Sequence, residues 1–233
     1  MHRLNDYFEK IYVISLRSAR NRRDHITNLS KKFVFKFEFV DAVDYKTIDV
    51  DKLKKEKKIA YPGNTFFCTR KCTCKGLGHE LNVKQLGPNL SHLKVWNKII
   101  DLNLGNALIL EDDCHFKPGF QNSFNEVAEN FPKNWNYICL GRNNKFKNSK
   151  KKIQKIKRGF SGGQLYGMSY LAAIKGVEHF FPMRANLDGY LDYFLIQKRY
   201  GSVGLKKCYA STENLGINGS VEGKFETSLQ KYF

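Results

Sequence analysis

The chain has 233 residues, and its 40 lysines and arginines against 22 acidic residues leave a formal net charge of +18. Because 42% of the residues are hydrophobic and 14% are aromatic, the chain folds around an apolar core, which excludes a disordered polycation. Its apolar runs are shorter than the ~18–20 residues of a membrane-spanning helix. The length fits a single domain over residues 1–233.

Cysteine usage and the start of the chain favour a reducing compartment. Six cysteines are too few for a disulfide scaffold in a chain of this length. The first fifteen residues lack the basic-then-apolar order of a signal peptide. We therefore expect a cytoplasmic protein, in a bacterium or in the host cell of a virus, that can lie against a membrane surface.

Half of the excess positive charge is concentrated in one segment. Residues 142–158 carry nine lysines or arginines and no acid, so we expect an exposed basic loop. Its charge is either simply solvated or contacts an anionic partner, such as a lipid phosphate, a polyanionic glycan or a nucleic acid. Nucleic acid is not favoured, because the sequence shows no zinc finger, RNP aromatic pair or basic zipper.

Apolar periodicity predicts the first elements in chain order. Residues 10–16 form a β-branched run that is typical of a buried strand; a basic turn over 17–23 and a short helix over 25–29 follow. Residues 33–43 alternate apolar and polar side chains and predict a second strand. Weak periodicity and scattered glycines over 44–85 indicate an irregular insertion that contains three cysteines.

A longer helix is predicted to begin at Gly87-Pro88, where proline suits the first turn, and to end near residue 101. The later elements are a buried strand at 107–110, a helix at 123–131, a buried strand at 137–140, a glycine-rich strand segment at 162–171, helices at 171–181 and 190–199, and a polar tail from 209. Strands that alternate with helices predict an α/β fold with a mostly parallel central sheet flanked by helices.

Three consecutive acids, Glu111, Asp112 and Asp113, follow directly after the apolar strand at 107–110. In an α/β sheet, ligands bind at the carboxyl ends of strands. Adjacent carboxylates repel one another unless a cation lies between them. Their hard oxygens suit Mg²⁺ or Mn²⁺, so a metal site is favoured over the alternative of a solvated acidic turn.

The basic turn after the first strand is a second candidate site. Its four arginines are Arg17, Arg20, Arg22 and Arg23. A nucleotide diphosphate needs cations and free backbone N–H groups at the start of a helix, and this turn supplies both. The alternative is an ordinary arginine-rich surface turn.

Five motifs in one order resemble glycosyltransferase family 25, the family of bacterial lipooligosaccharide galactosyltransferases and collagen hydroxylysine galactosyltransferases. They are IYVISL-x-x-x-R-x-x-R, GPNLSHLKVW, LILEDD, GGQLYGMSYLAA and NLDGYLDYFL, and the resemblance covers about residues 8–222. It implies a GT-A fold, a UDP-sugar donor and a Mn²⁺ or Mg²⁺ ion. The implied reaction moves galactose or glucose, with inversion, to a hydroxyl of a lipooligosaccharide, a glycan or a protein, including collagen-like hydroxylysine.

The resemblance also implies roles for individual residues. Asp113 is the first candidate for the metal, and Glu111 or Asp112 would reach the ribose or a metal-bound water. Of these two, Glu111 is assigned to the metal and Asp112 to the nucleotide. The segment that receives the nucleotide is matched by Ser15, Leu16, Arg17, Arg20 and Arg23. Late residues Asn218 and Ser220 match a segment that reaches the diphosphate. Ser91 and His92 match the family's Ser-His pair; for His92 we favour a hydrogen-bonded core histidine over a catalyst.

Asp188 and Asp192 match acids of a late Asp-rich segment in the family, where one of them would take the proton of the acceptor hydroxyl. An equally weighted alternative is structural. Asp188 would cap a helix that begins near Tyr190, and Asp192 would stabilise its first turn.

The cysteines leave several alternatives open. Cys68, Cys72, Cys74 and His79 could bind a structural zinc ion, remain free thiols or form a disulfide. The other three, Cys114, Cys139 and Cys208, lie in strand-like stretches and are expected to be small core residues.

Two other functions compete with sugar transfer. A non-catalytic basic module would bind nucleic acid or anionic glycan and would have no need for three acids in a site. A nucleotidyltransferase would share the metal carboxylates but would release pyrophosphate instead of UDP.

Overall fold

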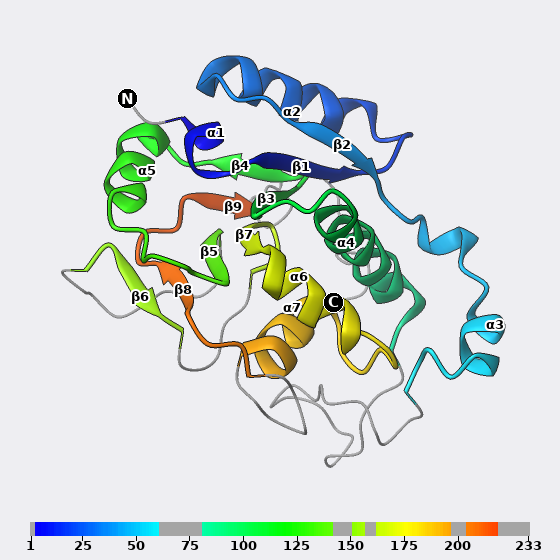
Figure 1. Cartoon of the computed structure of the whole chain (residues 1–233). Coiled ribbons are helices and arrows are strands. Elements are labelled where there is room, and N and C mark those ends of the chain that lie inside the picture. Colours follow the sequence, from blue (N-terminus) through cyan, green and yellow to red (C-terminus); the bar gives the residue numbers. More distant parts are fainter. Residues whose placement is uncertain (1–2, 61–80, 142–150, 157–161, 197–203, 219–233) are drawn as a thin grey trace, which may run out of the picture.

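A computed structural model describes residues 3–60, 81–141, 151–156, 162–196 and 204–218. Over these residues, one mixed sheet forms the centre of the molecule, with strands in the order β2-β1-β3-β7-β5-β8-β6 (Figure 1). Two further strands lie off this path, because β9 pairs with both β4 and β5. The strands are β1 (Lys10–Ser15), β2 (Glu38–Asp41), β3 (Asn106–Glu111), β4 (Cys114–Phe116), β5 (Tyr137–Gly141), β6 (Ile153–Lys155), β7 (Leu165–Ser169), β8 (Cys208–Ser211) and β9 (Gly216–Asn218).

Parallel pairing dominates the first half of the sheet. β1 runs parallel to both β2 and β3, and β5 runs parallel to β8. β7 lies antiparallel between β3 and β5, and β6 adds an antiparallel edge to β8. The predicted α/β fold is confirmed, and the parallel β1–β3 pair brings the ends of two neighbouring strands to one edge of the sheet.

Helices cover both faces of this sheet, because strand residues alternate between two apolar cores. On one face, Tyr12 and Ile14 of β1 pack with α4 (Val83–Asp101), α6 (Tyr170–Glu178) and α7 (Leu187–Gly189). On the other face, Ile11 and Val13 pack with α1 (Leu4–Tyr7), α2 (Arg20–Phe33) and α5 (Phe120–Ala128). The strand ends therefore lie between two helical layers.

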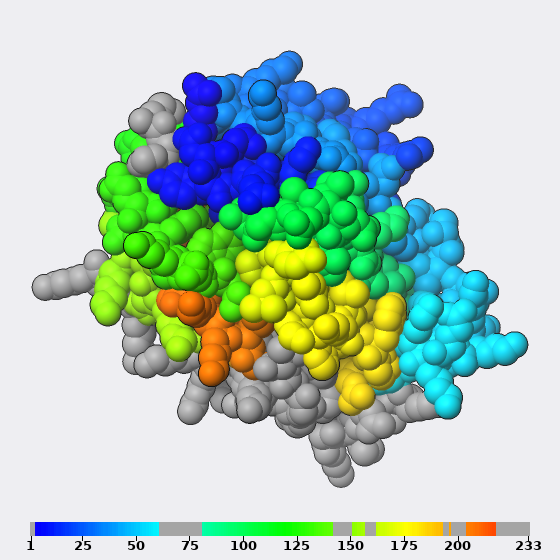
Figure 2. All heavy atoms as spheres, viewed as in Figure 1, coloured from blue at the N-terminus to red at the C-terminus, as the bar shows by residue number. Residues whose placement is uncertain are grey.

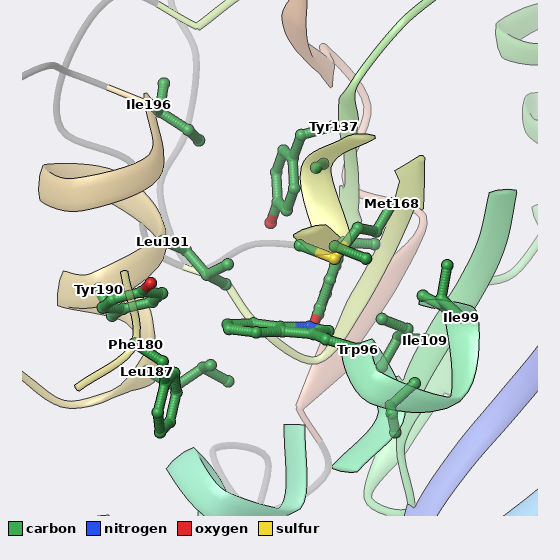
Figure 3. Close-up of a cluster of buried hydrophobic side chains, with 14 of the residues drawn as sticks. Trp96, Ile99, Ile109, Tyr137, Met168, Phe180, Leu187, Tyr190, Leu191 and Ile196 are labelled. Carbon is green, nitrogen blue, oxygen red and sulfur yellow. The ribbon is translucent and has the colours of Figure 1, made fainter. Parts of the chain in front are cut away.

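Trp96 of α4 occupies the centre of the first core and is fully buried. Figure 3 shows Tyr190, Phe180 and Leu187 on one side of its indole and Ile99 and Ile109 on the other. The indole stacks on Tyr190 with ring centroids 5.7 Å apart. Such aromatic packing fixes the position of α4 against the end of the sheet.

The helix predicted from Gly87-Pro88 begins earlier, at Val83. Asn82 caps it, and Gln85 completes the capping box by accepting from the Asn82 backbone N–H. Pro88 therefore lies inside α4, not at its start. The adjacent Gly87 allows a close approach, since a Cβ there would lie 2.9 Å from the Val43 carbonyl oxygen.

The strand predicted over 33–43 is mostly not a strand. α2 continues to Phe33 and ends at Val34, which adopts the left-handed conformation with φ 50°. Only Glu38–Asp41 pairs with β1 as β2. The alternating phenylalanines nevertheless contribute side chains to the second core. Phe35 is buried within this core, and the partly buried Phe33, Phe37 and Phe39 pack against the core.

The predicted irregular insertion over 44–85 contains regular structure where it is described. A short 3₁₀ helix, η1 (Tyr45–Thr47), and α3 (Val50–Lys55) are capped by the side chains of Asp44 and Asp49. α3 lies at the periphery of the molecule, in cyan at the edge of Figure 2. Residues 61–80 lie outside the described residues.

The predicted basic loop over 142–158 also contains a strand. Ile153–Lys155 forms β6 on the sheet edge, with Ile153 and Ile156 buried. Lys152 pairs with Glu126 and Glu213, so part of this charge is neutralised within the fold. Residues 142–150 and 157–158 lie outside the described residues.

The last predicted helix, at 190–199, begins earlier than expected. α7 starts at Leu187 and continues as a π-helical segment over Tyr190–Ile196. The polar tail from residue 209 contributes β8 and β9 to the sheet. Among the described residues, every helix is too short or too polar to cross a lipid bilayer.

Candidate active site

The carboxyl ends of β1 and β3 meet at one edge of the sheet. Ile14 is the register partner of Glu111, and the Asp112 backbone N–H donates to the Ile14 carbonyl oxygen at 3.2 Å. The parallel ladder therefore extends one step past the strand ends and brings Ser15 beside Asp112. The local cause is the run of apolar residues in both strands, which ends where polar side chains begin.

Glu111 and Asp112 point to opposite faces of the sheet, because neighbouring residues of an extended chain alternate. Asp112 lies on the α2 side and is 7% exposed. Its Oδ2 accepts from the Ser15 hydroxyl at 2.7 Å, and its Oδ1 accepts from Arg22 Nη1 at 3.0 Å. Asp112 thus ties β1, β3 and α2 together; its predicted ribose contact stays a prediction.

Glu111 lies on the α4 side, in an environment that disfavours its negative charge. Burial first, and then the nearby Asp188 and Asp112, together raise the pKa of Glu111 to about 8 against the opposing effect of Arg22. The side chain is still 29% exposed, so it can reach a ligand. A cation or a cationic complex bound here would relieve this unfavourable environment.

His92 links Glu111 to the core. Its Nε2 lies 3.3 Å from Glu111 Oε1, and its Nδ1 lies 2.7 Å from the Tyr166 hydroxyl. Trp96 Nε1 donates to the same hydroxyl at 3.0 Å. Burial lowers the pKa of His92 to about 3, so the imidazole is neutral. His92 is the hydrogen-bonded core histidine that the sequence favours, and one of its partners is a site carboxylate.

Asp113 completes the acid cluster at the start of the turn into β4. It is 5% exposed, and it contributes with Glu111 to raising the pKa of the Cys114 thiol, for which burial is the main cause. Among the described residues, no three His, Cys, Asp or Glu side chains converge as a ready-made metal site. Mg²⁺ and Mn²⁺ commonly use only one or two protein carboxylates together with substrate phosphates, so the pair Glu111 and Asp113 fits that chemistry.

The arginine turn is organised by an acid that sequence reasoning missed. Asp41, at the end of β2, accepts from Arg17 Nε at 2.6 Å and from Arg23 Nη2 at 2.7 Å. Hydrogen bonds from Arg17 and Arg23 lower the pKa of Asp41. The Arg23 guanidinium lies over the Phe39 ring, 4.4 Å from its centroid. Arg17 and Arg20 are exposed at the mouth of the turn.

The N-terminus of α2 begins in the same turn without an acidic or polar cap. Its N-cap residue is Ala19, no side chain caps the helix, and its first turn holds no acid. Leu16 is half-buried, and its carbonyl oxygen accepts from Arg23 Nε at 3.3 Å. Positive backbone and side-chain charge therefore gather where an anion would bind.

Asp188 lies close enough to Glu111 to raise the pKa of that carboxyl. It does not cap its helix: Asn186 is the N-cap of α7, and its side chain accepts from the Gly189 N–H at 3.1 Å. The capping alternative for Asp188 is therefore wrong. Gly163 approaches this turn closely, since a Cβ there would lie 2.6 Å from Leu187 Cδ2.

The remaining predicted site residues lie in different surroundings. Asp192 is 2% exposed within the π-helical segment. Asn218 pairs in register with Cys114 through β9 and β4, so its backbone lies next to the acid cluster in the sheet. Ser220 lies outside the described residues. The roles of Asp188, Asp192 and Asn218 stay predictions.

A family model decides the classification. The model of glycosyltransferase family 25, described as an LPS biosynthesis protein family, matches residues 8–200. The chain belongs to glycosyltransferase family 25. The resemblance in the sequence is thereby confirmed, and the α/β sheet with acids at the end of β3 is consistent with a GT-A-like fold.

Relatives in family 25 share about a quarter of aligned residues with this chain. Procollagen galactosyltransferase 2 of Mus musculus is 28% identical over 138 residues, or 58% of this chain and 21% of that protein. A glycosyltransferase 25 family member of Aedes aegypti is 26% identical over 171 residues, or 72% of the chain and 27% of that protein. Inactive glycosyltransferase 25 family member 3 of Mus musculus is 28% identical over 138 residues, 58% of the chain and 22% of that protein. The chain thus spans about a quarter of the length of these relatives.

Several residues around the candidate site of this family 25 protein were missed in the sequence. Asp41 ends a strand just as Glu111 does, and that signal could have found it. Gln164 could not be found this way: its carbonyl oxygen accepts from the Glu111 N–H at 3.0 Å, and its buried Nε2 has no hydrogen-bond partner among the described residues. Tyr166 was also missed, because its hydrogen bond to His92 is apparent only in the folded protein.

The cysteine predictions divide between described and undescribed residues. Cys68, Cys72, Cys74 and His79 lie outside the described residues. The prediction of small core cysteines is confirmed, because all three are buried free thiols: Cys114, Cys139 and Cys208.

Proposed function

We propose that the chain transfers a hexose from a UDP-sugar to a hydroxyl acceptor, with inversion and with a divalent cation. One observation carries the proposal. The parallel β1–β3 pair places acids at the same sheet edge as the uncapped, arginine-rich start of α2. A metal-bound diphosphate carries both signs of charge and complements both halves of this edge. Membership in family 25 supports the same reaction class.

Glu111 and Asp113 would hold Mn²⁺ or Mg²⁺, because hard carboxylate oxygens suit these ions and both acids lie close enough to Cys114, just past the end of β3, to raise its pKa. When bound, the cation supplies Lewis acidity toward the leaving diphosphate. Arg17, Arg20 and the α2 N-terminus would hold the phosphates from the other side. Ser15 and Leu16 would shape the floor of the nucleotide site, where Ser15 is already fixed by Asp112.

Asp188 is our first candidate for the base that takes the acceptor proton. Two observations support this choice: Asp188 lies close enough to Glu111 to raise its pKa, and Asp188 is half-buried. Asp192 is the second candidate, but its near-complete burial requires the acceptor to reach into the π-helical segment. A carboxylate in either role would act as a general base.

The proposed partners follow from the reaction. Two relatives named procollagen galactosyltransferase 2, from Mus musculus and Homo sapiens, make UDP-galactose the first donor to test. The acceptor would be a glycan, a lipid-linked saccharide or a protein hydroxyl. A cytoplasmic location remains part of this proposal.

A donor-hydrolysis screen tests the function. Purified protein is incubated with UDP-, GDP- and CMP-sugars in the presence of Mn²⁺, and the released nucleotide is measured with and without EDTA. We expect Mn²⁺-dependent release of UDP from UDP-galactose or UDP-glucose. Pyrophosphate release from a nucleoside triphosphate would instead indicate a nucleotidyltransferase. Absence of calorimetric UDP binding with Mn²⁺ would indicate a non-catalytic basic module.

A further inference from the structure

A chain of hydrogen bonds runs from the centre of the core to the acid cluster. It joins Trp96 Nε1, the Tyr166 hydroxyl, the His92 ring and Glu111 Oε1, with successive distances of 3.0, 2.7 and 3.3 Å. Trp96 and Tyr166 are fully buried and His92 is 1% exposed, while Glu111 is partly exposed. This series of hydrogen bonds therefore begins at Trp96, which no ligand can reach, and ends at Glu111, which a ligand can reach.

Donor and acceptor chemistry sets the direction of every link. An indole N–H can only donate, so the Tyr166 oxygen accepts from Trp96. Tyr166 then has one hydrogen to give, and His92 Nδ1 lies 2.7 Å away. Burial raises the pKa of Tyr166, so this hydroxyl keeps its proton. His92 Nδ1 must consequently accept, which leaves the imidazole proton on Nε2, facing Glu111.

The opposite arrangement leaves a buried donor unsatisfied. If His92 Nδ1 carried the proton, the Tyr166 oxygen would receive two N–H groups and its own hydrogen would lose this acceptor. The Nε2–H arrangement holds for an ionised Glu111 and also for a neutral one, because Oε1 can accept as a carbonyl oxygen while Oε2 carries the proton.

We propose that Trp96, Tyr166 and His92 are positioning residues that hold Glu111 Oε1 and present Oε2 to the donor complex. This inference rests on the proposed function for what Oε2 binds. His92 is the last link and is nearly inaccessible, so it acts through Glu111 without touching the substrate itself. Rigid orientation of a site carboxylate by a buried hydrogen-bonded group is a common requirement of metal and nucleotide sites.

A spectroscopic experiment tests the proposed direction of these hydrogen bonds without any ligand. Long-range ¹H–¹⁵N NMR of the ¹⁵N-labelled full chain distinguishes a protonated from an unprotonated ring nitrogen. We expect a single Nε2–H form of His92 in the wild-type protein. In Tyr166→Phe, which keeps the ring but removes the hydroxyl, we expect a mixture of both forms. An Nδ1–H form in the wild-type protein would overturn the proposal.

Tyr190→Phe is the matched control. Tyr190 belongs to the same core, stacks on the same indole, and donates its hydroxyl to the Gly176 carbonyl oxygen at 2.6 Å. The variant removes a buried phenol hydroxyl outside the chain. We expect it to keep the Nε2–H form of His92 and to hydrolyse UDP-galactose within about 2-fold of the wild-type rate.

Hydrolysis of UDP-galactose with Mn²⁺ provides the second readout. We expect Tyr166→Phe and His92→Ala to lower kcat/KM by about 10- to 100-fold. We expect His92→Gln, whose amide can again donate toward Glu111, to keep kcat/KM within about 5-fold of the wild-type value and clearly above that of His92→Ala. Equal activity of Tyr166→Phe and Tyr190→Phe would overturn the positioning role. Failure of the wild-type protein to bind UDP or to hydrolyse any donor would refute the proposed function. The NMR result would still show whether the series of hydrogen bonds from Trp96 to Glu111 has the proposed direction.

Discussion

Ser15 donates its hydroxyl hydrogen to Asp112 Oδ2 at 2.7 Å, across the pair of strand ends that form the proposed site. Both residues are buried, so the bond forms away from solvent. Replacing Ser15 with Ala leaves one oxygen of a buried carboxylate without this donor. We expect the free energy of unfolding in urea to fall by about 1–3 kcal/mol. Ser18→Ala, on the exposed turn, is the control and should change it by less than about 0.5 kcal/mol.

Glu111→Gln should make the unliganded protein more stable at pH 8 while impairing its activity. Glu111 is largely desolvated and lies near Asp188 and Asp112, so removing its charge relieves an unfavourable environment. We expect a gain of about 1–3 kcal/mol in the free energy of unfolding, measured in EDTA by urea titration. UDP-galactose hydrolysis should fall at least about 100-fold. A destabilised variant would contradict the electrostatic account of this site.

Asp113→Ala should remove metal-dependent turnover without a comparable loss of structure. If Asp113 is a metal ligand, its loss weakens Mn²⁺ binding directly. We expect donor hydrolysis to fall at least about 100-fold and the calorimetric affinity for UDP to lose its Mn²⁺ dependence. Circular dichroism should report an unchanged fold. Wild-type activity in this variant would eliminate Asp113 as a ligand.

Asp41 should contribute stability at neutral pH that disappears in acid. Its pKa is lowered in the folded state by Arg17 and Arg23, so its stabilising effect is present above the unfolded value near 3.8 and is lost as the pH falls through the folded value. Because the side chain is 39% exposed, we expect Asp41→Asn to cost no more than about 1 kcal/mol at pH 7.

The difference between Asp41→Asn and the wild-type protein should shrink as the pH falls below about 4, and it should also shrink in high salt. Urea titrations from pH 7 to pH 3 follow it. Asp101→Asn, at the exposed end of α4, is the control for loss of an acid elsewhere. A difference that grows in acid would mean that Asp41 is not held ionised by the two arginines.

Much of the sheet was predictable, because a buried strand leaves a continuous apolar run. The runs at β1, β3 and β5 were recognised for this reason, and β7 was predicted as part of a glycine-rich strand segment. β4, β6, β8 and β9 were missed, since they are short strands whose pairing depends on distant segments. The start of α4 was placed at a conspicuous Gly-Pro pair, whereas the capping pair of Asn82 and Gln85 set the true boundary.

Only the part of the candidate site that follows from the order of residues along the chain could be predicted. Acids directly after a strand indicate a strand-end site, and this reasoning located Glu111, Asp112 and Asp113. It could not separate them, because strand alternation assigns each acid to a face only once the neighbouring helices are known. The contact between His92 and Tyr166 joins residues 74 positions apart and leaves no local signal.

Because Glu111 and Asp112 face opposite sides of the sheet, the proposed catalysis and the folding of the protein would depend on different acids that are adjacent in the chain. Asp112 is hydrogen-bonded to Ser15 and Arg22, whereas the charged form of Glu111 lowers the stability of the unliganded fold. An evolutionary descendant of this protein could lose Glu111, become more stable and keep the same fold. Such a protein would have lost its catalytic activity but kept its fold, and selection could then act on binding alone.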